Sequence, residues 1–532
     1  MLLHRRLSPW IFLPFAFITI LIVFFGNGNK KTTSVLTVIT QVDVNDLLPF
    51  TEDFDNNAIK EDDDEDEDDD YVKDEDEDGR KNPTCHRSMR KQPNFNDLVK
   101  KFYDSSKWKP INCQYYSKIY VEDVDGVLYF RGGDYSSSYL CKAMPIYRAT
   151  EDSHKQGKAV KIKSFPYSDW PNDTDFLAIL CRKHEENSTV HPSFAGVFSH
   201  IIGATKPSIQ TPTPFLPKLH KKADEKPIEE KWNVLILTID SLSRMNAFHR
   251  LPESMAKLKE LQAVDQKWNN KIGLNTYPNT LAMLTGLDYN KVGFNYNKSF
   301  DEFPFIWKGF KQANYKTFYA EDSAPDYTSF NYQRKGFIQQ PVDHYGRIFF
   351  KVAHGVTEES IKQKGICLMG QFAHSVLWKY MKQFVQAYHG VLPIFGMSFV
   401  NEITHDYFAN VAQLDGELVE LLNWLDEKHV FDDTFVIIWS DHGQRIDDVR
   451  KSDVLGRLED QTPFSSIIVP TKFRRLHPTL VNNLEHNSNR LSTSYDLHHT
   501  LRHILCISNG QQCPECKFYP TRAFFFNYFC HL

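Results

Sequence analysis

The sequence has no internal repeat, and nowhere do basic residues alternate with aromatic ones. The first absence excludes solenoids and propellers built from repeated units. The second argues against nucleic acid as a partner. Cysteine is scarce, with nine in 532 residues, and Cys513 and Cys516 lack a second pair at the spacing of a zinc knuckle. Disulfides are therefore a simpler use of these cysteines than a structural zinc site.

Basic residues are almost missing from one segment. Residues 61–78 hold fifteen acidic residues and one lysine, so the segment carries −14, whereas the whole chain carries −6 and the remainder +8. A self-repelling run of low complexity is typical of a disordered spacer. Calcium binding is the alternative. We predict an acidic disordered stalk over residues 26–84.

Long hydrophobic runs are rare too, and the stretch from Pro9 to Phe25 is the candidate for a membrane segment. Its length is at the lower end for a spanning helix and long for a cleaved signal. We predict a transmembrane signal-anchor at residues 9–25 after a cytoplasmic stub at residues 1–8. Gly26-Asn27-Gly28 offers a cleavage site, and cleavage would yield a secreted protein.

Basic residues flank this apolar stretch on both sides, so they do not fix its orientation. Three glycosylation sequons (Asn172, Asn187 and Asn297) and the cysteines indicate a lumenal or extracellular body. We therefore predict a single-pass type II membrane protein of the secretory pathway, in the Golgi or at the cell surface. Because nine is odd, at least one thiol is free or paired between chains. The oligomeric state is not predicted.

The rest of the chain divides into three parts. Residues 85–228 form a cysteine-containing region that ends in a proline- and lysine-rich linker, residues 229–505 form the core, and residues 506–532 form a cysteine-rich tail. In the core, strand and helix patterns alternate, which predicts an α/β sheet sandwiched by helices. The predicted helices are Met255–Ala263, Ala282–Thr285 ending at Gly286, and Val411–Leu425, and the predicted strands include Tyr315–Ala320 and Leu392–Val400.

Two apolar runs end in possible metal ligands. Residues 234–239 lead into Asp240, and residues 435–440 lead into Asp441, His442 and Gly443. Short β-branched runs are typical of buried strands, and ligands of open α/β sheets bind beyond the carboxyl ends of such strands. We therefore expect these side chains to share one divalent cation. The alternatives are a helix cap at Asp240 and a simple turn at Asp441.

A hydroxyl nucleophile is predicted in the segment Asn275-Thr-Tyr-Pro-Asn279. Pro278 suits the first turn of a helix, so Thr276 would lie at a helix N-terminus, where backbone N–H groups favour an anion. A hydroxyl on a divalent metal can ionise and attack phosphorus or sulfur, giving a covalent ester. Asn279 could donate to an oxygen of the transferred group. The alternatives are that Thr276 is an N-cap and that Asn279 is an ordinary first-turn residue.

These residues resemble the alkaline phosphatase superfamily, which includes sulfatases, nucleotide phosphodiesterases and phosphoethanolamine transferases. More narrowly, the chain is similar to a sulfatase-like family of animals that is abundant in nematodes and insects. The motifs that carry this likeness are Leu237-Thr-Ile-Asp-Ser-Leu-Ser-Arg244, Phe330-Asn-Tyr-Gln-Arg-Lys-Gly-Phe337, Thr404-His-Asp-Tyr-Phe408, Ser440-Asp-His-Gly-Gln-Arg445, Gly456-Arg-Leu-Glu-Asp-Gln-Thr-Pro-Phe464 and Tyr495-Asp-Leu-His498. The resemblance implies an alkaline-phosphatase-like fold, with Asp240, Thr276, Asp441 and His442 as metal ligands and Thr276 as nucleophile.

Departures from the superfamily pattern narrow the chemistry. No C/S-x-P-x-R motif stands at Thr276, which disfavours sulfatase hydrolysis through formylglycine. The two-zinc phosphodiesterases place an aspartate four residues before a histidine, whereas Asn401 precedes His405 here. We therefore expect one zinc or manganese ion, with a second uncertain, and we assign His405 to substrate or leaving-group contact. A structural histidine, or a second metal held by His405, is the alternative.

Arg445 and Glu459 complete the set of candidates. Arg445 could neutralise a phosphate oxygen, and Glu459 could hold Arg445 or a metal-bound water, unless the two form a surface ion pair. The function predicted from the sequence is a metal-dependent phosphodiester hydrolase, or a phosphoethanolamine- or phosphorylcholine-type transferase, acting on glycans or lipid head groups. The alternatives are a sulfatase that works without formylglycine and a non-catalytic extracellular binding protein.

Overall fold

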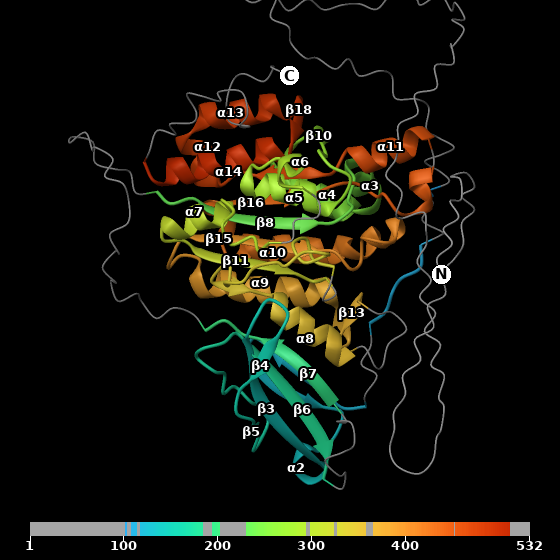
Figure 1. Cartoon of the computed structure of the whole chain (residues 1–532), viewed down its shortest axis with the longest axis vertical. Coiled ribbons are helices and arrows are strands. Elements are labelled where there is room, and N and C mark those ends of the chain that lie inside the picture. The colour runs from blue at the N-terminus through green and yellow to red at the C-terminus, as the bar shows by residue number, and fades with distance from the viewer. Residues whose placement is uncertain are drawn as a thin grey trace, which may run out of the picture. The chain divides into compact units, whose positions relative to one another are not determined.

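A seven-stranded sheet forms the centre of the core in the computed structural model (Figure 1). The structure describes residues 102–103, 108–113, 118–184, 194–202, 230–293, 298–323, 327–357, 365–451 and 453–510. From edge to edge the strand order is β12-β11-β15-β8-β16-β17-β9; the first five are parallel to one another, β17 runs antiparallel to β16, and β9 runs antiparallel to β17. The strands are β8 (Asn233–Ile239), β9 (Val264–Asp265), β11 (Lys316–Glu321), β12 (His344–Tyr345), β15 (Ile394–Val400), β16 (Thr434–Trp439) and β17 (Ser465–Ile468).

The three middle strands, β15, β8 and β16, are buried along their whole length. Helices cover both faces of the sheet, so a middle strand needs apolar residues on both sides. Alternate residues of β8 accordingly enter different cores: Leu235 and Leu237 pack on one face, and Val234 and Ile236 on the other. The continuous apolar runs in the sequence arise from this two-sided burial.

Two groups of helices sandwich the sheet, as Figure 1 shows. Helices α4, α8, α9 and α10 contribute to one core, and α5, α7, α12, α13 and α14 to the other. Their bounds are α4 (Pro252–Glu260), α5 (Thr276–Thr285), α7 (Ile306–Gln312), α8 (Arg347–Thr357), α9 (Ala373–Tyr388), α10 (Leu414–Glu427), α12 (Thr471–Leu476), α13 (Pro478–Asn487) and α14 (Ser494–Ser508). The predicted α/β class, with helices on both faces, is confirmed.

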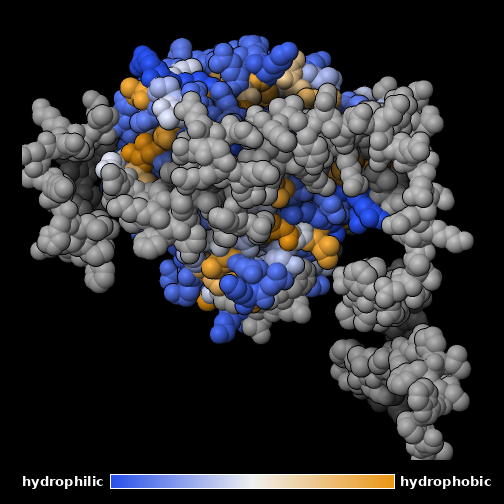
Figure 2. Space-filling model, turned by 90° about the horizontal axis from the view of Figure 1, so that it is seen from above, coloured by the Kyte–Doolittle hydropathy of each residue, from blue (hydrophilic) through white to orange (hydrophobic). Residues whose placement is uncertain are grey.

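Shorter elements complete the core. They are α3 (Arg244–Arg250), α6 (Tyr289–Val292), α11 (Asp453–Gln461), β10 (Trp268–Asn270), β13 (Cys367–Leu368), β14 (Gln371–Phe372), β18 (Leu491–Thr493) and the 3₁₀ turns η3 (Phe408–Gln413), η4 (Val430–Asp432) and η5 (Asp448–Lys451). Figure 2 shows mostly hydrophilic residues, with scattered apolar ones, on the visible described surface.

A separate antiparallel sheet precedes the core and packs against α8 through a shared apolar cluster. The sheet consists of β3 (Tyr139–Arg148), β4 (His154–Gln156), β5 (Val160–Lys161), β6 (Phe176–Lys183) and β7 (Phe194–Ser199), next to the hairpin β1 (Tyr120–Val124) and β2 (Val127–Arg131) and the short α2 (Tyr135–Ser138). One disulfide, Cys141–Cys181, joins opposite residues of β3 and β6. A second, Cys113–Cys367, ties the segment before β1 to the core. The predicted use of cysteines in disulfides is confirmed for these four.

The predicted elements of the core are present, with shifted ends. Helix α4 begins at Pro252 and ends before the predicted Ala263, because the chain enters β9 at Val264. Helix α5 ends where predicted, since Gly286 takes the left-handed conformation with φ of 68°. The predicted helix from Val411 begins as the 3₁₀ turn η3 and continues as α10.

The predicted stub, anchor and stalk (residues 1–84) and the linker up to residue 229 lie outside the described residues. So do residues 511–532 of the predicted tail. In the parts of the chain that the structure describes, we find no helix with the length and apolar character of a membrane span.

Candidate metal centre

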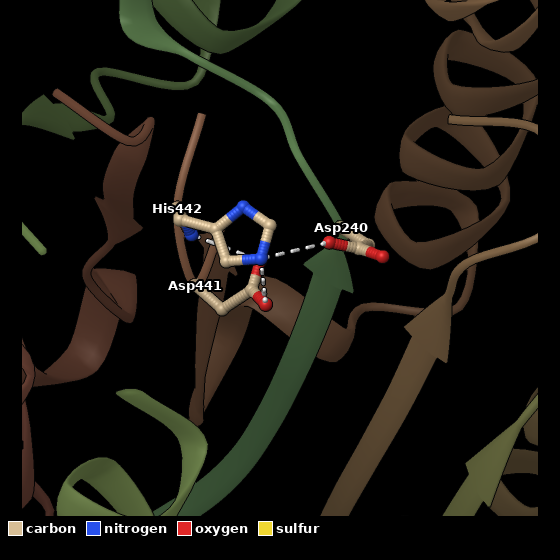
Figure 3. A group of neighbouring side chains, drawn as sticks. All are labelled: Asp240, Asp441 and His442. Atoms are coloured by element: carbon tan, nitrogen blue, oxygen red, sulfur yellow. Dashed lines mark hydrogen bonds and ion pairs between the residues drawn. The ribbon is translucent and has the colours of Figure 1, made fainter. Parts of the chain in front are cut away.

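The two predicted strand ends meet. Strands β8 and β16 are parallel neighbours, with Thr238 opposite Trp439, so Asp240 and Asp441 follow adjacent strand ends. One ligand atom each of Asp240, Asp441 and His442 lies within 4.8 Å of the others, and all three side chains are buried (Figure 3). The structure therefore brings together three of the four predicted metal ligands as one group.

His442 is oriented by its own backbone. Its Nδ1 lies 2.8 Å from the carbonyl oxygen of Gly443, so Nδ1 carries the proton and donates it there. The bare Nε2 then faces the carboxylates, 3.3 Å from Oδ2 of Asp441 and 3.7 Å from Oδ1 of Asp240. Burial lowers the pKa of His442, and the charge of Asp441 only partly opposes this effect. The imidazole is therefore neutral, which is the form that binds a metal.

The two buried carboxylates lie close together. Burial and the nearby charge of Asp441 raise the pKa of Asp240 to about 8, although His405, Arg445 and the hydroxyl of Ser241 act to lower it. Asp441 Oδ1 accepts the backbone N–H of His442 at 2.9 Å, but no described residue donates a hydrogen bond to Oδ2. This buried oxygen faces the lone pair of His442 Nε2, and two such atoms at 3.3 Å require a proton or a cation between them. The donor set therefore fits a divalent metal.

Backbone strain accompanies the group. Ser241, which follows Asp240, has φ of 58°, a conformation uncommon for a residue with a side chain. Its hydroxyl donates to Oδ1 of Asp240 at 3.0 Å, and its N–H points at Oδ1 of Asp441 at 3.4 Å. The strained turn thus contacts both carboxylates and fixes their separation.

Thr276 is the first residue of α5, as predicted, and Asn275 is its N-cap. The Thr276 hydroxyl oxygen lies 3.4 Å from Nε2 of His442. The hydroxyl therefore borders the candidate metal site and also lies at a helix N-terminus, where free N–H groups favour negative charge. The hydroxyl of the fourth predicted ligand thus lies next to the imidazole of His442.

Asn279 forms its hydrogen bonds within its own loop. Its amide donates to the carbonyl oxygens of Gly273 and Asn275, at 3.0 and 2.9 Å, and its oxygen accepts the N–H of Ile272 at 2.7 Å. Both amide hydrogens are therefore used inside the loop. In this structure the side chain shapes the loop that carries Thr276, and donation from Asn279 to a transferred group stays a prediction.

His405 and Arg445 lie at the edge of the group. His405 Nδ1 contacts Asp406 at 2.6 Å, and its Nε2 is 3.4 Å from an Nη of Arg445. Burial alone would lower the pKa of His405, but the bond to Asp406 and the charge of Asp240 raise it above the ordinary value. Both residues thus come to the site as predicted, and His405 tends to carry a proton.

Asn401, the departure noted in the sequence, takes part in another contact. Its backbone N–H donates to Asp322 at 2.6 Å, and its amide donates to the carbonyl oxygen of Phe399 at 3.0 Å. In the described part of the chain, no second group of three metal-ligating side chains accompanies Asp240, Asp441 and His442.

Glu459 does not contact Arg445. Its carboxylate accepts the hydroxyls of Tyr103 and Ser243, and Ser243 in turn caps α3. Burial raises the pKa of Glu459 well above its ordinary value. The predicted role in holding Arg445 or a metal-bound water is thus corrected. Glu459 fastens the turn after Asp240 to the segment that precedes β1.

Two functional candidates were missed. Gln444 joins the loops behind the site: its oxygen accepts the N–H of Arg445 at 2.9 Å, and its amide points at the carbonyl oxygen of His405 at 3.3 Å. Its place in the Ser440–Arg445 motif was a usable signal. Lys271 is buried against Asp460, and its positive charge acts on His442. A single lysine in a polar loop gave no signal.

Gly443 is required by close packing. A Cβ at this position would lie 1.4 Å from the carbonyl oxygen of Glu459, which no side chain can accommodate. We expect Gly443→Ala to displace the Asp441–His442 loop, to destabilise the fold by about 1–3 kcal/mol and to weaken metal binding. Thermal unfolding and metal content measure both effects.

Gly416→Ala is the matched control, because an added Cβ there meets no atom within 4 Å and Gly416 lies in helix α10. It should leave metal binding unchanged and stabilise the helix slightly. A Gly443→Ala variant with full metal content would contradict the close-packing argument.

No curated protein matches the chain. Among solved structures, similarity is found to the C-terminal periplasmic domain of EcEptC from Escherichia coli, with 14% identity, 58% of this chain and 90% of that chain covered, and a TM-score of 0.37. The lipoteichoic acid synthase LtaP from Listeria monocytogenes has 13% identity, 57% and 76% coverage and a TM-score of 0.38. The PsFucS1 sulfatase from Pseudoalteromonas sp. has 11% identity, 52% and 68% coverage and a TM-score of 0.35.

The family comparison covers most of the chain. Residues 83–515 match the model of the family described as "Protein of unknown function (DUF229)", a range that spans the antiparallel sheet, the core and every residue of the candidate metal centre. The chain therefore belongs to the DUF229 family.

Proposed function

We propose that this protein is a metal-dependent enzyme that hydrolyses or transfers phosphoric esters through an ester of Thr276. The substrates would be phosphodiesters, such as phosphoethanolamine or phosphorylcholine groups, on glycans or lipid head groups. One observation supports this most strongly: the Thr276 hydroxyl lies 3.4 Å from the neutral imidazole of a buried Asp-Asp-His group. A hydroxyl beside such a group suits nucleophilic attack.

Asp240, Asp441, His442 and Thr276 would hold one zinc or manganese ion. The bound cation would supply positive charge that neutralises the carboxylates and favours the alkoxide form of Thr276. In the proposed reaction, the Thr276 oxygen bonds to phosphorus, and the bond from phosphorus to the leaving oxygen breaks. Attack by water, or by an acceptor alcohol, on the Thr276 ester then restores the hydroxyl.

His405 and Arg445 suit the remaining tasks. The raised pKa of His405 keeps a proton that the leaving oxygen can accept. Arg445 lies next to His405. Its charge lowers the pKa of Asp240, so the guanidinium is close enough to act on a group bound at the metal centre. A guanidinium there can pair with a non-bridging phosphate oxygen.

The choice of phosphorus over sulfur rests on the residue at position 276. A threonine cannot supply the formylglycine on which ordinary sulfatases depend, whereas a threonine alkoxide suits phosphoryl transfer. Asn401, which stands in place of an aspartate, supports the alternative of a non-catalytic binding protein. The intact donor set of the metal centre favours catalysis instead.

The body of the protein would face an oxidising compartment. The disulfides Cys113–Cys367 and Cys141–Cys181 support a lumenal or extracellular location, because such bonds persist there. We propose that residues 9–25 anchor the chain in the membrane in a type II orientation. Substrates on lipid head groups or on membrane-attached glycans would then lie within reach.

Matched aryl substrates test the proposal. We expect the full-length chain, purified in detergent and supplied with zinc or manganese, to cleave an aryl phosphodiester with a kcat/KM at least roughly tenfold above that for the matching aryl sulfate. The Asp441→Asn variant controls for contaminating activity. Preference for the sulfate would support the sulfatase alternative. An absence of metal uptake and of turnover would support the binding-protein alternative.

A further inference from the structure

Five exposed lysines lie on or beside strands β3, β4 and β5 of the antiparallel sheet, far from the candidate metal centre in sequence. They are Lys142 on β3, Lys155 on β4, Lys161 on β5, and Lys158 and Lys163 beside these strands. We call this set the lysine ribbon. The stretch from His154 to Lys163 contains four of the five and no acidic residue.

Three members of the lysine ribbon share one face. Lys142 lies between the buried Cys141 and Ala143, and Lys161 and Lys163 flank the buried Ile162. Cys141, Ala143 and Ile162 belong to a single apolar cluster. Since side chains alternate across a strand, the three lysines point away from that cluster, on the opposite face.

Two of these lysines are direct cross-strand neighbours. Lys142 is opposite Lys161 in the pairing of β3 with β5. Like charges directly opposite each other destabilise a sheet, because their Cβ atoms are only about 4.5–5.5 Å apart. A strand pair that places two lysines there gains stability when an anion binds between them.

Acidic residues nearby do not neutralise the ribbon. Among the residues that the structure describes, none of the five lysines forms an ion pair. Asp152, just before β4, pairs with Arg347 and Lys351. Asp173 lies against the hydroxyl of Tyr147, which is opposite Lys155 and five residues along β3 from Lys142. On the other side of β3, β6 adds Lys183 opposite Tyr139. The positive charge is therefore available to an external partner.

We propose that the lysine ribbon binds a linear polyanionic polysaccharide through its repeated sulfate or carboxylate groups. Lys161 and Lys163 are two residues apart, which in extended chain separates them by about 6.6–6.8 Å, and Lys142 lies opposite Lys161. Three neighbouring positive charges on one face suit a linear chain with regularly repeated anions. The disulfide Cys141–Cys181 lies on the strand that carries Lys142 and indicates an extracellular or lumenal location, where such glycans occur and nucleic acids do not compete. This site is independent of the metal centre and of the function proposed for it.

Binding of heparin, used as the polyanion probe, to the full-length chain in detergent tests the proposal. The ribbon variant is Lys142→Gln, Lys161→Gln and Lys163→Gln together. The control variant is Lys259→Gln, Lys291→Gln and Lys428→Gln, which removes the same charge from exposed positions of the core. At physiological salt we expect the ribbon variant to bind heparin at least roughly tenfold more weakly than wild type, and the control to bind normally.

Further measurements distinguish specific binding of a polyanion by the lysine ribbon from a general effect of net charge. Affinity of the wild type should fall as salt rises, neutral dextran should not bind, and turnover of a small soluble ester should be the same in all three proteins. Equal losses in both triple variants would reduce the effect to net charge and overturn the proposal. So would a wild type that ignores heparin, or one that binds anionic vesicles in preference to it.

Discussion

Thr276→Ala is expected to lower kcat for phosphodiester cleavage by at least about a thousandfold, because the variant has no oxygen to form the covalent ester. The loss should appear in kcat/KM to the same extent, since the nucleophile acts in the transition state and contributes little to substrate binding. Steady-state kinetics with an aryl phosphodiester measure both constants. A metal assay on the same samples shows whether the cation is retained through Asp240, Asp441 and His442.

Thr276→Ser is the matched variant, because it keeps a hydroxyl at the N-terminus of α5. We expect it to retain a substantial part of the activity and to become labelled by substrate, as the wild type does. Mass spectrometry of the rapidly quenched protein would find the added group on the peptide that contains residue 276. Undiminished turnover by Thr276→Ala would show that Thr276 is not the nucleophile, and it would not contradict the proposed metal site.

The convergence of Asp240, Asp441 and His442 could be predicted because it follows from local rules. A β-branched apolar run is a buried strand, parallel strands end at one edge of their sheet, and residues just after those ends share that edge. Thr276 could be predicted with them because a proline in a first turn marks a helix N-terminus. In all four cases a few neighbouring residues determine the position.

The roles of Asn279 and Glu459 could not be predicted, because their partners are set by tertiary structure. Asn279 faces the backbone of its own loop only because residues 272–275 fold back over the first turn of α5. Glu459 meets Tyr103, which is more than three hundred residues earlier in the chain. When a side chain has several possible hydrogen-bond partners, the tertiary structure determines which one it contacts. No sequence pattern near Asn279 or Glu459 indicates that partner.

The antiparallel sheet was not predicted either. Its region was recognised by its cysteines and not by its strands. Only part of the alternation in β3 is regular, since Cys141 and Ala143 pack on one face and Ile146 on the other. This change of the buried face arises because α8 covers one half of the sheet and the hairpin of β1 and β2 covers the other. When the buried face of a strand changes along its length, apolar and polar residues no longer alternate regularly in the sequence.

Removal of the divalent cation is expected to abolish turnover and to make stability fall as pH rises. In the metal-free fold the pKa of Asp240 is raised from 3.8 to about 8 by burial and by Asp441. The folded state therefore holds a proton that the unfolded chain releases. The stability that this proton provides is fully present below pH 3.8 and is lost as pH rises through about 8. His442 acts oppositely near its ordinary pKa, because burial lowers its pKa in the fold.

Thermal unfolding of the chelated protein between about pH 5 and about pH 8, with and without added zinc or manganese, measures this effect. A cation at a hundredfold excess over its Kd adds about 2.7 kcal/mol, and the gain should be larger at the alkaline end, where the cation replaces the lost proton. Asp240→Asn removes the titrating carboxyl, so its metal-free stability should no longer fall across this range. The same fall in Asp240→Asn would place the titration elsewhere, and a cation-independent wild type would show that the buried carboxylates are compensated by protons alone.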